Sequence, residues 1–153
     1  MLVRMIAVDR IRSPHVAALC ADLRERLAPY HSYAELEVRS GDGNDPRAAM
    51  RDEAARVLRH VRGDDRVWLL ERTGTQLSSE VLASRLARVA HDGAQRLTLI
   101  VAGTYGADAT LKVRAEFLWS LSELTFLHEW SRAIVLEQLY RAAKIVRNEP
   151  YHH

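Results

Sequence analysis

Strand-like segments alternate with helix-like segments along the whole chain, and this alternation limits the possible folds more than any other feature. The expected strands cover residues 2–8, 33–38, 67–71, 97–101 and 116–119. The expected helices cover residues 14–28, 46–61, 78–92 and 129–146, with a short helical turn at 110–114. Strands that alternate with helices favour an α/β fold built on a parallel sheet flanked by helices. The length of 153 residues suits one domain, residues 1–153.

The ends of the helices carry recognisable capping residues. Ser13, Asp45 and Ser78 each stand where a helix is expected to begin, and a side-chain oxygen at that position can accept a backbone N–H. We expect the second helix to run to about Val61. Gly74 is expected to end the third strand, because glycine weakens regular structure.

Composition points to a protein of the cytoplasm. No apolar run approaches the roughly 20 residues that a membrane-spanning helix needs. The apolar stretch at residues 5–8 is followed at once by charges and is too short for a signal-peptide core. Cys20 is the single cysteine, so no internal disulfide forms, and its place on a helix predicts a small buried apolar side chain.

Common chemical motifs are missing from the sequence. The net charge of +2 is spread evenly, without the basic stripe typical of a nucleic-acid footprint. The histidines and the cysteine show no metal-ligand spacing, so no metal site is expected. The segment from Gly103 to Gly106 follows an expected strand, but a lone Gly-x-x-Gly also fits a simple tight turn.

Physical rules for parallel sheets locate the ligand. Ligands of such sheets bind outside the carboxyl ends of the strands. This rule directs attention to the segments that follow Glu71, Val101 and Trp119.

Three motifs in the C-terminal third are more specific. They are Leu-Ser-Glu-Leu-Thr-Phe-Leu-His at 121–128, Arg-Ala-Ile-Val-Leu-Glu-Gln-Leu-Tyr-Arg-Ala at 132–142, and Pro-Tyr-His at 150–152. Together they resemble the SPOUT class of small RlmH-type 23S rRNA (pseudouridine-N3)-methyltransferases. That family shows a Trp-Ser-Leu-Ser-x-x-Thr loop, an Arg-x-x-Leu-x-Glu-Gln-x-Tyr-Arg-Ala helix and a Pro-Tyr-His tail. The likeness extends over the length and strand order of the whole chain.

The resemblance implies a fold, an assembly and a cofactor. It implies an α/β fold with a C-terminal deep trefoil knot, an exception to the general rule against knots, and a homodimer. It also implies S-adenosyl-L-methionine held by three loops. Transferred to this sequence, the cofactor-binding residues are Leu70, Glu71, Gly103, Leu121, Ser122, Glu123, Leu124, Thr125, Phe126 and Leu127.

The chemistry of these residues suits an adenosyl ligand. Leu121, Leu124 and Phe126 could form an apolar slot for adenine, with core packing as the alternative role. Gly103 would let the backbone approach the ligand closely.

The resemblance also implies catalytic residues. Methyl transfer to an imide nitrogen releases a proton, and His152, with Tyr151 beside it, is the expected general base. The tail that carries them is expected to complete the site of the partner subunit. Arg132 and Arg141 could hold phosphate or the cofactor carboxylate. Glu137 is also a candidate, although Glu137 and Arg141 stand four apart on a helix, which equally fits an ordinary salt pair.

Several segments depart from the family pattern. The family's Gly-Gly-Pro-x-Gly loop is Ala-Gly-Thr-Tyr-Gly at residues 102–106, and its Pro-His step is Leu127-His128. An acidic, glycine-rich stretch at residues 41–45 replaces a lysine-rich one, which weakens phosphate binding.

These departures keep three functions open. The first expected function is methylation of pseudouridine in 23S rRNA of assembled ribosomes. The second is methylation of a free nucleoside or other small heterocycle, in an enclosed pocket roofed by Tyr105 and Trp130. The third is a binding module that has lost the chemistry.

Overall fold

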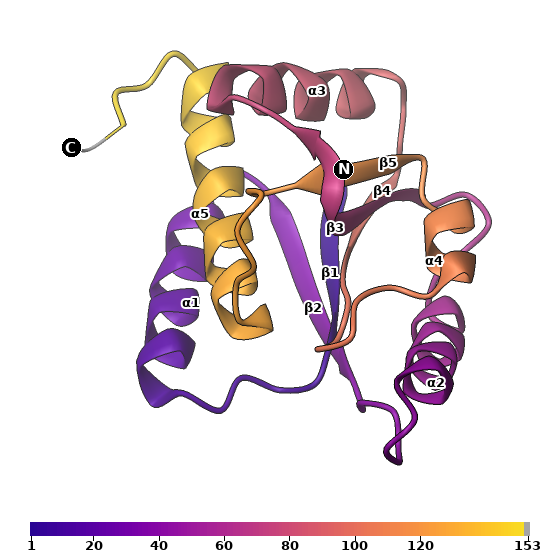
Figure 1. The fold of residues 1–153 in the computed structure, drawn as a ribbon. Helices are drawn as coiled ribbons and strands as arrows, with labels where there is room; N and C mark the ends of the chain where they lie inside the picture. Colours follow the sequence, from indigo (N-terminus) through magenta and orange to yellow (C-terminus); the bar gives the residue numbers. More distant parts are fainter. Residues whose placement is uncertain (152–153) are drawn as a thin grey trace.

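A parallel five-stranded sheet forms the centre of the protein, as the computed structural model of residues 1–151 shows (Figure 1). The strand order is β2-β1-β4-β3-β5. The strands are β1 (Leu2–Val8), β2 (Ser32–Val38), β3 (Arg66–Gln76), β4 (Arg96–Val101) and β5 (Phe117–Ser120). The expected parallel α/β sheet is confirmed.

Helices cover both faces of this sheet. They are α1 (Pro14–Leu27), α2 (Pro46–Leu58), α3 (Ser79–His91), α4 (Ala109–Arg114) and α5 (His128–Val146). The larger apolar core joins one face of the sheet to α1, α3 and α5, and it includes Cys20, which is fully buried as expected. The smaller core joins the other face to α2 and α4. No helix within residues 1–151 is both long and apolar enough to cross a bilayer.

The capping residues act as the sequence predicts. Ser13, Asp45 and Ser78 each accept a backbone N–H at the start of α1, α2 and α3. The second helix ends at Leu58, earlier than expected. After Leu58 the backbone hydrogen bonds change to the i to i+3 pattern. The N–H of Val61 donates to the carbonyl of Leu58 at 3.2 Å in this turn.

The prediction that Gly74 ends the third strand is wrong. Strand β3 continues to Gln76, and its pairing with β5 shifts register so that both Leu70 and Thr75 lie opposite Trp119. A Cβ atom on Gly74 would lie 2.4 Å from the carbonyl oxygen of Leu118. Glycine therefore permits a close approach of two backbones at a bulge instead of ending the strand.

A buried ion cluster fixes the amino ends of the central strands. The Asp65 side chain is fully buried and accepts hydrogen bonds from Arg4 at 2.9 Å, Arg96 at 2.5 Å and Thr98 at 3.0 Å. Burial alone would raise the pKa of the Asp65 carboxyl, yet these bonds and one from the Arg62 N–H hold that pKa below its usual value. The cluster ties β1 and β4 to the start of β3.

Candidate active site

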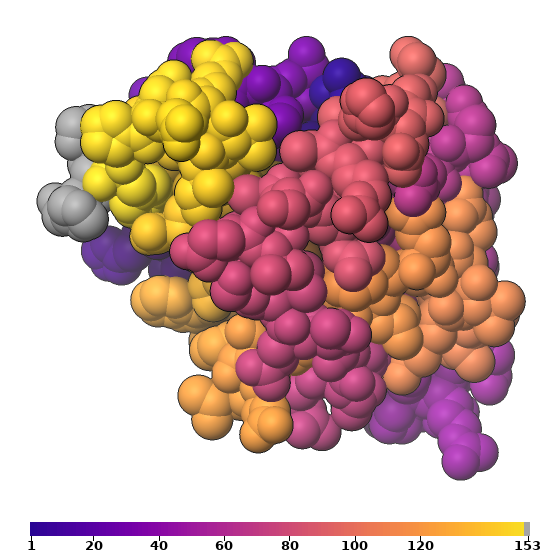
Figure 2. All heavy atoms as spheres, turned by 90° about the horizontal axis from the view of Figure 1, so that it is seen from above, coloured from indigo at the N-terminus to yellow at the C-terminus, as the bar shows by residue number. Residues whose placement is uncertain are grey.

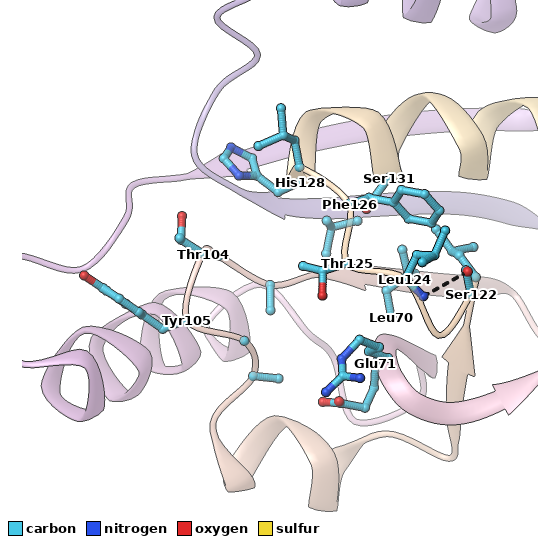
Figure 3. Close-up of a pocket in the computed structure, with 18 of the residues that line it drawn as sticks. Leu70, Glu71, Thr104, Tyr105, Ser122, Leu124, Thr125, Phe126, His128 and Ser131 are labelled. Atoms are coloured by element: carbon cyan, nitrogen blue, oxygen red, sulfur yellow. Dashed lines mark hydrogen bonds between the residues drawn. The ribbon is translucent and has the colours of Figure 1, made fainter.

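A pocket of about 650 Å³ lies at the carboxyl ends of the strands (Figure 3). Residues 70–72 of β3, the segments after β4 and β5, and the first turn of α5 form it. Because β4, β3 and β5 are neighbours in the sheet, these parts of the chain meet at one edge. The sheet rule selected the segments after β4 and β5 correctly, whereas the pocket residues of the third strand lie within β3, which continues to Gln76.

Nine of the ten residues predicted to bind the cofactor line this pocket. They are Leu70, Glu71, Gly103, Leu121, Ser122, Leu124, Thr125, Phe126 and Leu127. Glu123 does not line it. Cofactor binding by these residues stays a prediction, although their position supports it.

Exposure distinguishes the two roles that were open for the apolar residues of the 121–127 segment. Leu124 and Leu127 are each 70% exposed and Phe126 is 36% exposed, so none of them packs in the core. Leu121 alone of the segment packs against the larger core. Exposed apolar side chains that line a pocket are available to a ligand.

Hydrogen bonds of two serines give the 121–127 segment its shape. The hydroxyl of Ser120 lies 2.9 Å from the carbonyl oxygen of Arg72 and 3.1 Å from that of Ser122. The hydroxyl of Ser122 accepts the N–H of Leu124 at 3.0 Å (Figure 3). These contacts tie the segment to β3 on one side and close a turn on the other.

A buried carboxylate supports the Gly103–Gly106 turn from behind. The N–H of Gly106 donates to the carbonyl of Gly103 at 3.0 Å, and Gly106 has a positive φ of 89° that favours glycine. Glu53 of α2 is 4% exposed, and one carboxylate oxygen accepts the N–H of Gly41 at 3.0 Å. Its other oxygen has no hydrogen-bond partner among the described residues and lies 2.7 Å from the place of a Cβ on Gly103. Sequence reasoning missed Glu53, whose signal is an acid within the apolar stripe of α2.

The carboxylate of Glu71 also lines the pocket, and two neighbouring side chains hold it in place. It lies 3.0 Å from the Lys112 ammonium and accepts the Thr73 hydroxyl at 3.1 Å. Burial by itself would raise the pKa of the Glu71 carboxyl, but the bonds from Lys112 and Thr73 outweigh it and lower that pKa. Glu71 is therefore an ionised acceptor at neutral pH.

The pocket has two unlike sides. Leu70, Leu124 and Phe126 gather on one side, and Thr104, Tyr105 and His128 stand on the other (Figure 3). Tyr105 lines the pocket and is half exposed. Trp130, expected beside it as a roof, is also half exposed and does not line the pocket. The arrangement lacks one of the two residues that the small-molecule hypothesis needs.

Arg132 lies away from the pocket and is engaged by the sheet. It is 2% exposed, and its guanidinium contacts Glu35 and donates to Glu37 at 2.7 Å. It also donates to the carbonyl of Asp9 at 3.3 Å, at a backbone position with a positive φ of 68°. In the structure Arg132 thus joins α5 to β2 and to the end of β1, and its expected catalytic role stays a prediction.

Glu137 and Tyr151 contact each other beside the middle of α5. Arg141 donates to Glu137 at 2.7 Å, which confirms the salt pair considered for these two residues, and the Tyr151 hydroxyl also donates to Glu137. Glu137 stands nine residues after His128, so it lies about 14 Å further along the helix axis. Tyr151 therefore lies far from the pocket of its own chain, and His152 lies outside the described residues.

Comparison with known proteins identifies the class. The family model described as "Predicted SPOUT methyltransferase" matches residues 1–152. The chain therefore belongs to the SPOUT methyltransferase family, and the resemblance drawn from its C-terminal motifs is confirmed. It is a methyltransferase.

Curated relatives of full length point to one group within that family. The chain is 37% identical to the ribosomal RNA large subunit methyltransferase H of Gloeobacter violaceus, over 100% of this chain and 99% of the relative. It is 38% identical to the protein of that name from Syntrophotalea carbinolica, over 99% of each chain. It is 31% identical to that of Dictyoglomus thermophilum, over 100% of each chain.

Proposed function

We propose that this chain methylates N3 of a pseudouridine in 23S rRNA, with S-adenosylmethionine as methyl donor. The observation that carries the proposal is the pocket beside residues 70–72 of β3 and the carboxyl ends of β4 and β5, lined by nine residues predicted for that donor. The relatives, which are named for methylation of large-subunit rRNA and match over full length, support the acceptor. A protein that acts on ribosomes belongs in the cytoplasm. The relatives do not favour methylation of a small heterocycle.

The pocket residues fit an adenosyl ligand. A volume of about 650 Å³ falls within the usual range of small-molecule sites, about 300–1,000 Å³. The apolar side formed by Leu70, Leu124 and Phe126 would hold the adenine ring, and the ionised Glu71 would accept hydrogen bonds from ribose hydroxyls. We also propose that the 121–127 segment and α5 form a deep trefoil knot, as the family resemblance implies.

The residues of this chain must align the acceptor and remove its proton. The donor supplies an electrophilic methyl group on a sulfonium, and alignment contributes most of the rate in such a displacement. His152 would take the imide proton as general base, with Tyr151 beside it and Glu137 holding the Tyr151 hydroxyl. His128 lines the pocket and is the residue to compare with His152. Arg132 would act through the scaffold at Asp9 and β2.

We expect His152→Ala to lower kcat by about 100-fold, the effect typical of losing a general base. The affinity for S-adenosylmethionine should stay unchanged, because no described tail residue, up to Tyr151, lines the donor pocket. Single-turnover methyl transfer and calorimetry would measure the two quantities separately, with His128→Ala as the matched comparison. Loss of activity in His128→Ala alone would move the role of the base to the pocket histidine.

A homodimer would bring the tail to a pocket. The Tyr151 hydroxyl bonds to Glu137, about 9 Å along α5 beyond Ser131, a helix residue that lines the pocket, so the tail of a second copy is the better source of the base. Leu124, Leu127 and Trp130 are half exposed or more beside the pocket, as expected of a surface that a second chain covers. We expect a mixture of a His152→Ala chain and a Gly103→Val chain, each inactive alone, to regain activity. Mixed dimers without recovery would contradict a shared site.

Ribosomes from a strain that lacks its own large-subunit pseudouridine methyltransferase provide the test of the acceptor. We expect transfer of a labelled methyl group from S-adenosylmethionine to 23S rRNA in these ribosomes. Mass spectrometry of the digested RNA should place it on pseudouridine. Transfer to free pseudouridine without transfer to ribosomes would establish the small-molecule reaction instead.

Substitution of Gly103 tests whether the pocket binds S-adenosylmethionine. In Gly103→Ala the new Cβ would meet the Glu53 carboxylate at 2.7 Å, and Glu53 cannot move without leaving the Gly41 N–H. We expect the affinity for S-adenosylmethionine to fall by about tenfold, since a strained wall costs roughly 1–3 kcal/mol. Calorimetric titration would measure this change.

A shorter acid at position 53 provides the matched control. Combining Gly103→Ala with Glu53→Asp withdraws the carboxylate by one methylene and should restore part of the affinity. Equal affinity of the single variant and the unaltered protein would show that the Gly103 turn does not shape the donor site.

A further inference from the structure

Lys144 is a buried lysine near the end of α5, where the tail begins. It is 8% exposed. Its ammonium donates to the Glu149 carboxylate at 2.8 Å and lies 3.4 Å from the Tyr30 hydroxyl. The Tyr30 hydroxyl in turn donates to the same Glu149 oxygen at 2.6 Å. We call Tyr30, Lys144 and Glu149 the tail clamp.

Each member of the tail clamp belongs to a different part of the chain. Tyr30 follows α1, Lys144 lies in the last turn of α5, and Glu149 is beyond that helix. A buried ammonium is costly unless it is paired, so Lys144 strongly favours a Glu149 side chain turned back to the helix. The hydrogen bond from Lys144 lowers the pKa of Glu149, and the bond to Glu149 raises the pKa of Lys144, which keeps the pair charged at neutral pH.

The backbone conformation of Asn148 turns the chain back toward α5. Asn148 has a φ of 55°, in the left-handed region that asparagine tolerates better than most residues. The N–H of Asn148 donates to the Ile145 carbonyl at 3.1 Å, and that of Glu149 donates to the Lys144 carbonyl at 3.0 Å. These bonds end the helix and reverse the chain, as in common helix C-terminal motifs.

Aromatic contacts extend the tail clamp toward the next residues. The rings of Tyr30 and Tyr140 meet edge to face at 5.8 Å, and those of Tyr140 and Tyr151 are 5.7 Å apart. The Arg141 guanidinium lies 3.6 Å from the centre of the Tyr151 ring. Seen from above, the end of α5 that carries this cluster lies beside α3 (Figure 2).

We propose that the tail clamp fixes the point and direction at which the last residues leave α5, and that Tyr30, Lys144 and Glu149 are positioning residues for methyl transfer. The role in methyl transfer rests on the proposed function, in which this tail carries the general base. A base on a short tail is effective only when few tail conformations compete with the reactive one. Loss of the tail clamp should therefore lower kcat and leave donor affinity intact, because the pocket is at the other end of α5.

Limited trypsin digestion tests the tail clamp without any assay of activity. Arg147 precedes Asn148, so cleavage there releases the peptide of residues 148–153. We expect Lys144→Met and Glu149→Gln to release this peptide at least about tenfold faster than the unaltered chain, in the native protein. Tyr30→Phe removes only one hydroxyl and should give a smaller increase of about threefold. Arg88→Met, on the exposed side of α3, is the control and should release it at the unaltered rate.

Measurements of kcat and of the Kd for S-adenosylmethionine distinguish a positioning role of the tail clamp from a merely structural one. In Lys144→Met we expect kcat to fall by about 10- to 100-fold with an unchanged Kd for S-adenosylmethionine, and Lys144→Arg to recover most of it. Unchanged peptide release in both Lys144→Met and Tyr30→Phe would overturn the tail clamp. Faster release with an unchanged kcat would overturn its positioning role. If the unaltered enzyme methylates no ribosomal RNA, the proposed acceptor fails, and the digestion still decides on the tail clamp.

Discussion

Replacing Arg132 with methionine is expected to lower the free energy of unfolding by about 3–5 kcal/mol, the range found when a buried ion pair loses one partner. The change leaves the Glu35 and Glu37 carboxylates without their shared cation and the Asp9 carbonyl without its donor. Methionine keeps most of the side-chain volume, so the loss reports charge and hydrogen bonding more than packing. Urea titration followed by circular dichroism measures it.

Two further variants make this result specific to Arg132. Arg26→Met removes an exposed pair with Asp22, whose side chains are about half exposed, and should change stability by about 0.5 kcal/mol or less. Adding Glu37→Gln to Arg132→Met should recover part of the loss, because Glu37 then carries no unpaired charge, whereas Glu35 keeps its ion pair with Arg24 at 2.9 Å. A stable Arg132→Met enzyme with a greatly reduced kcat would instead support the catalytic role suggested by the sequence.

Gly74→Ala is expected to cost about 3 kcal/mol, at the upper end of the usual range for overpacking. Its Cβ would lie 2.4 Å from the carbonyl oxygen of Leu118, which is a backbone atom of the paired strand and cannot rotate away. Strand β5 leads directly into the 121–127 segment, so displacing it should also weaken binding of S-adenosylmethionine by tenfold or more. Thermal unfolding and calorimetry give the two measurements.

Gly63→Ala is the matched control for this substitution. No atom lies within 4 Å of a Cβ at Gly63, and its φ is outside the left-handed region. Its stability should change by less than about 1 kcal/mol. A Gly74→Ala protein as stable as this control would mean that the bulge between β3 and β5 can open without cost.

Local signals explain why much of the fold was predictable. Strand and helix order follows from apolar spacing, and the starts of α1, α2 and α3 follow from side-chain caps that act within a few residues. The edge of the sheet that carries the pocket was predictable because parallel α/β sheets bind ligands at the carboxyl ends of their strands. The three segments of the pocket could therefore be located without coordinates.

Features that depend on distant neighbours were not predictable in this way. Gly74 and Glu53 owe their roles to the approach of Leu118 and Gly103, which no local pattern encodes. The contacts of Arg132 were not predictable, because its carboxylate partners lie on β2, about 95 residues earlier in the chain.

The buried cluster around Asp65 has a consequence for how such a protein can diverge. It secures the amino edge of the sheet, while the loops that line the pocket occupy the opposite edge. The exposed residues Asp42, Asn44, Thr104 and Tyr105 on that opposite edge can therefore accumulate changes of charge and size at little risk to folding. Exchanging the loops at residues 41–45 and 103–106 between relatives should transfer acceptor preference, while the recipient keeps its melting temperature.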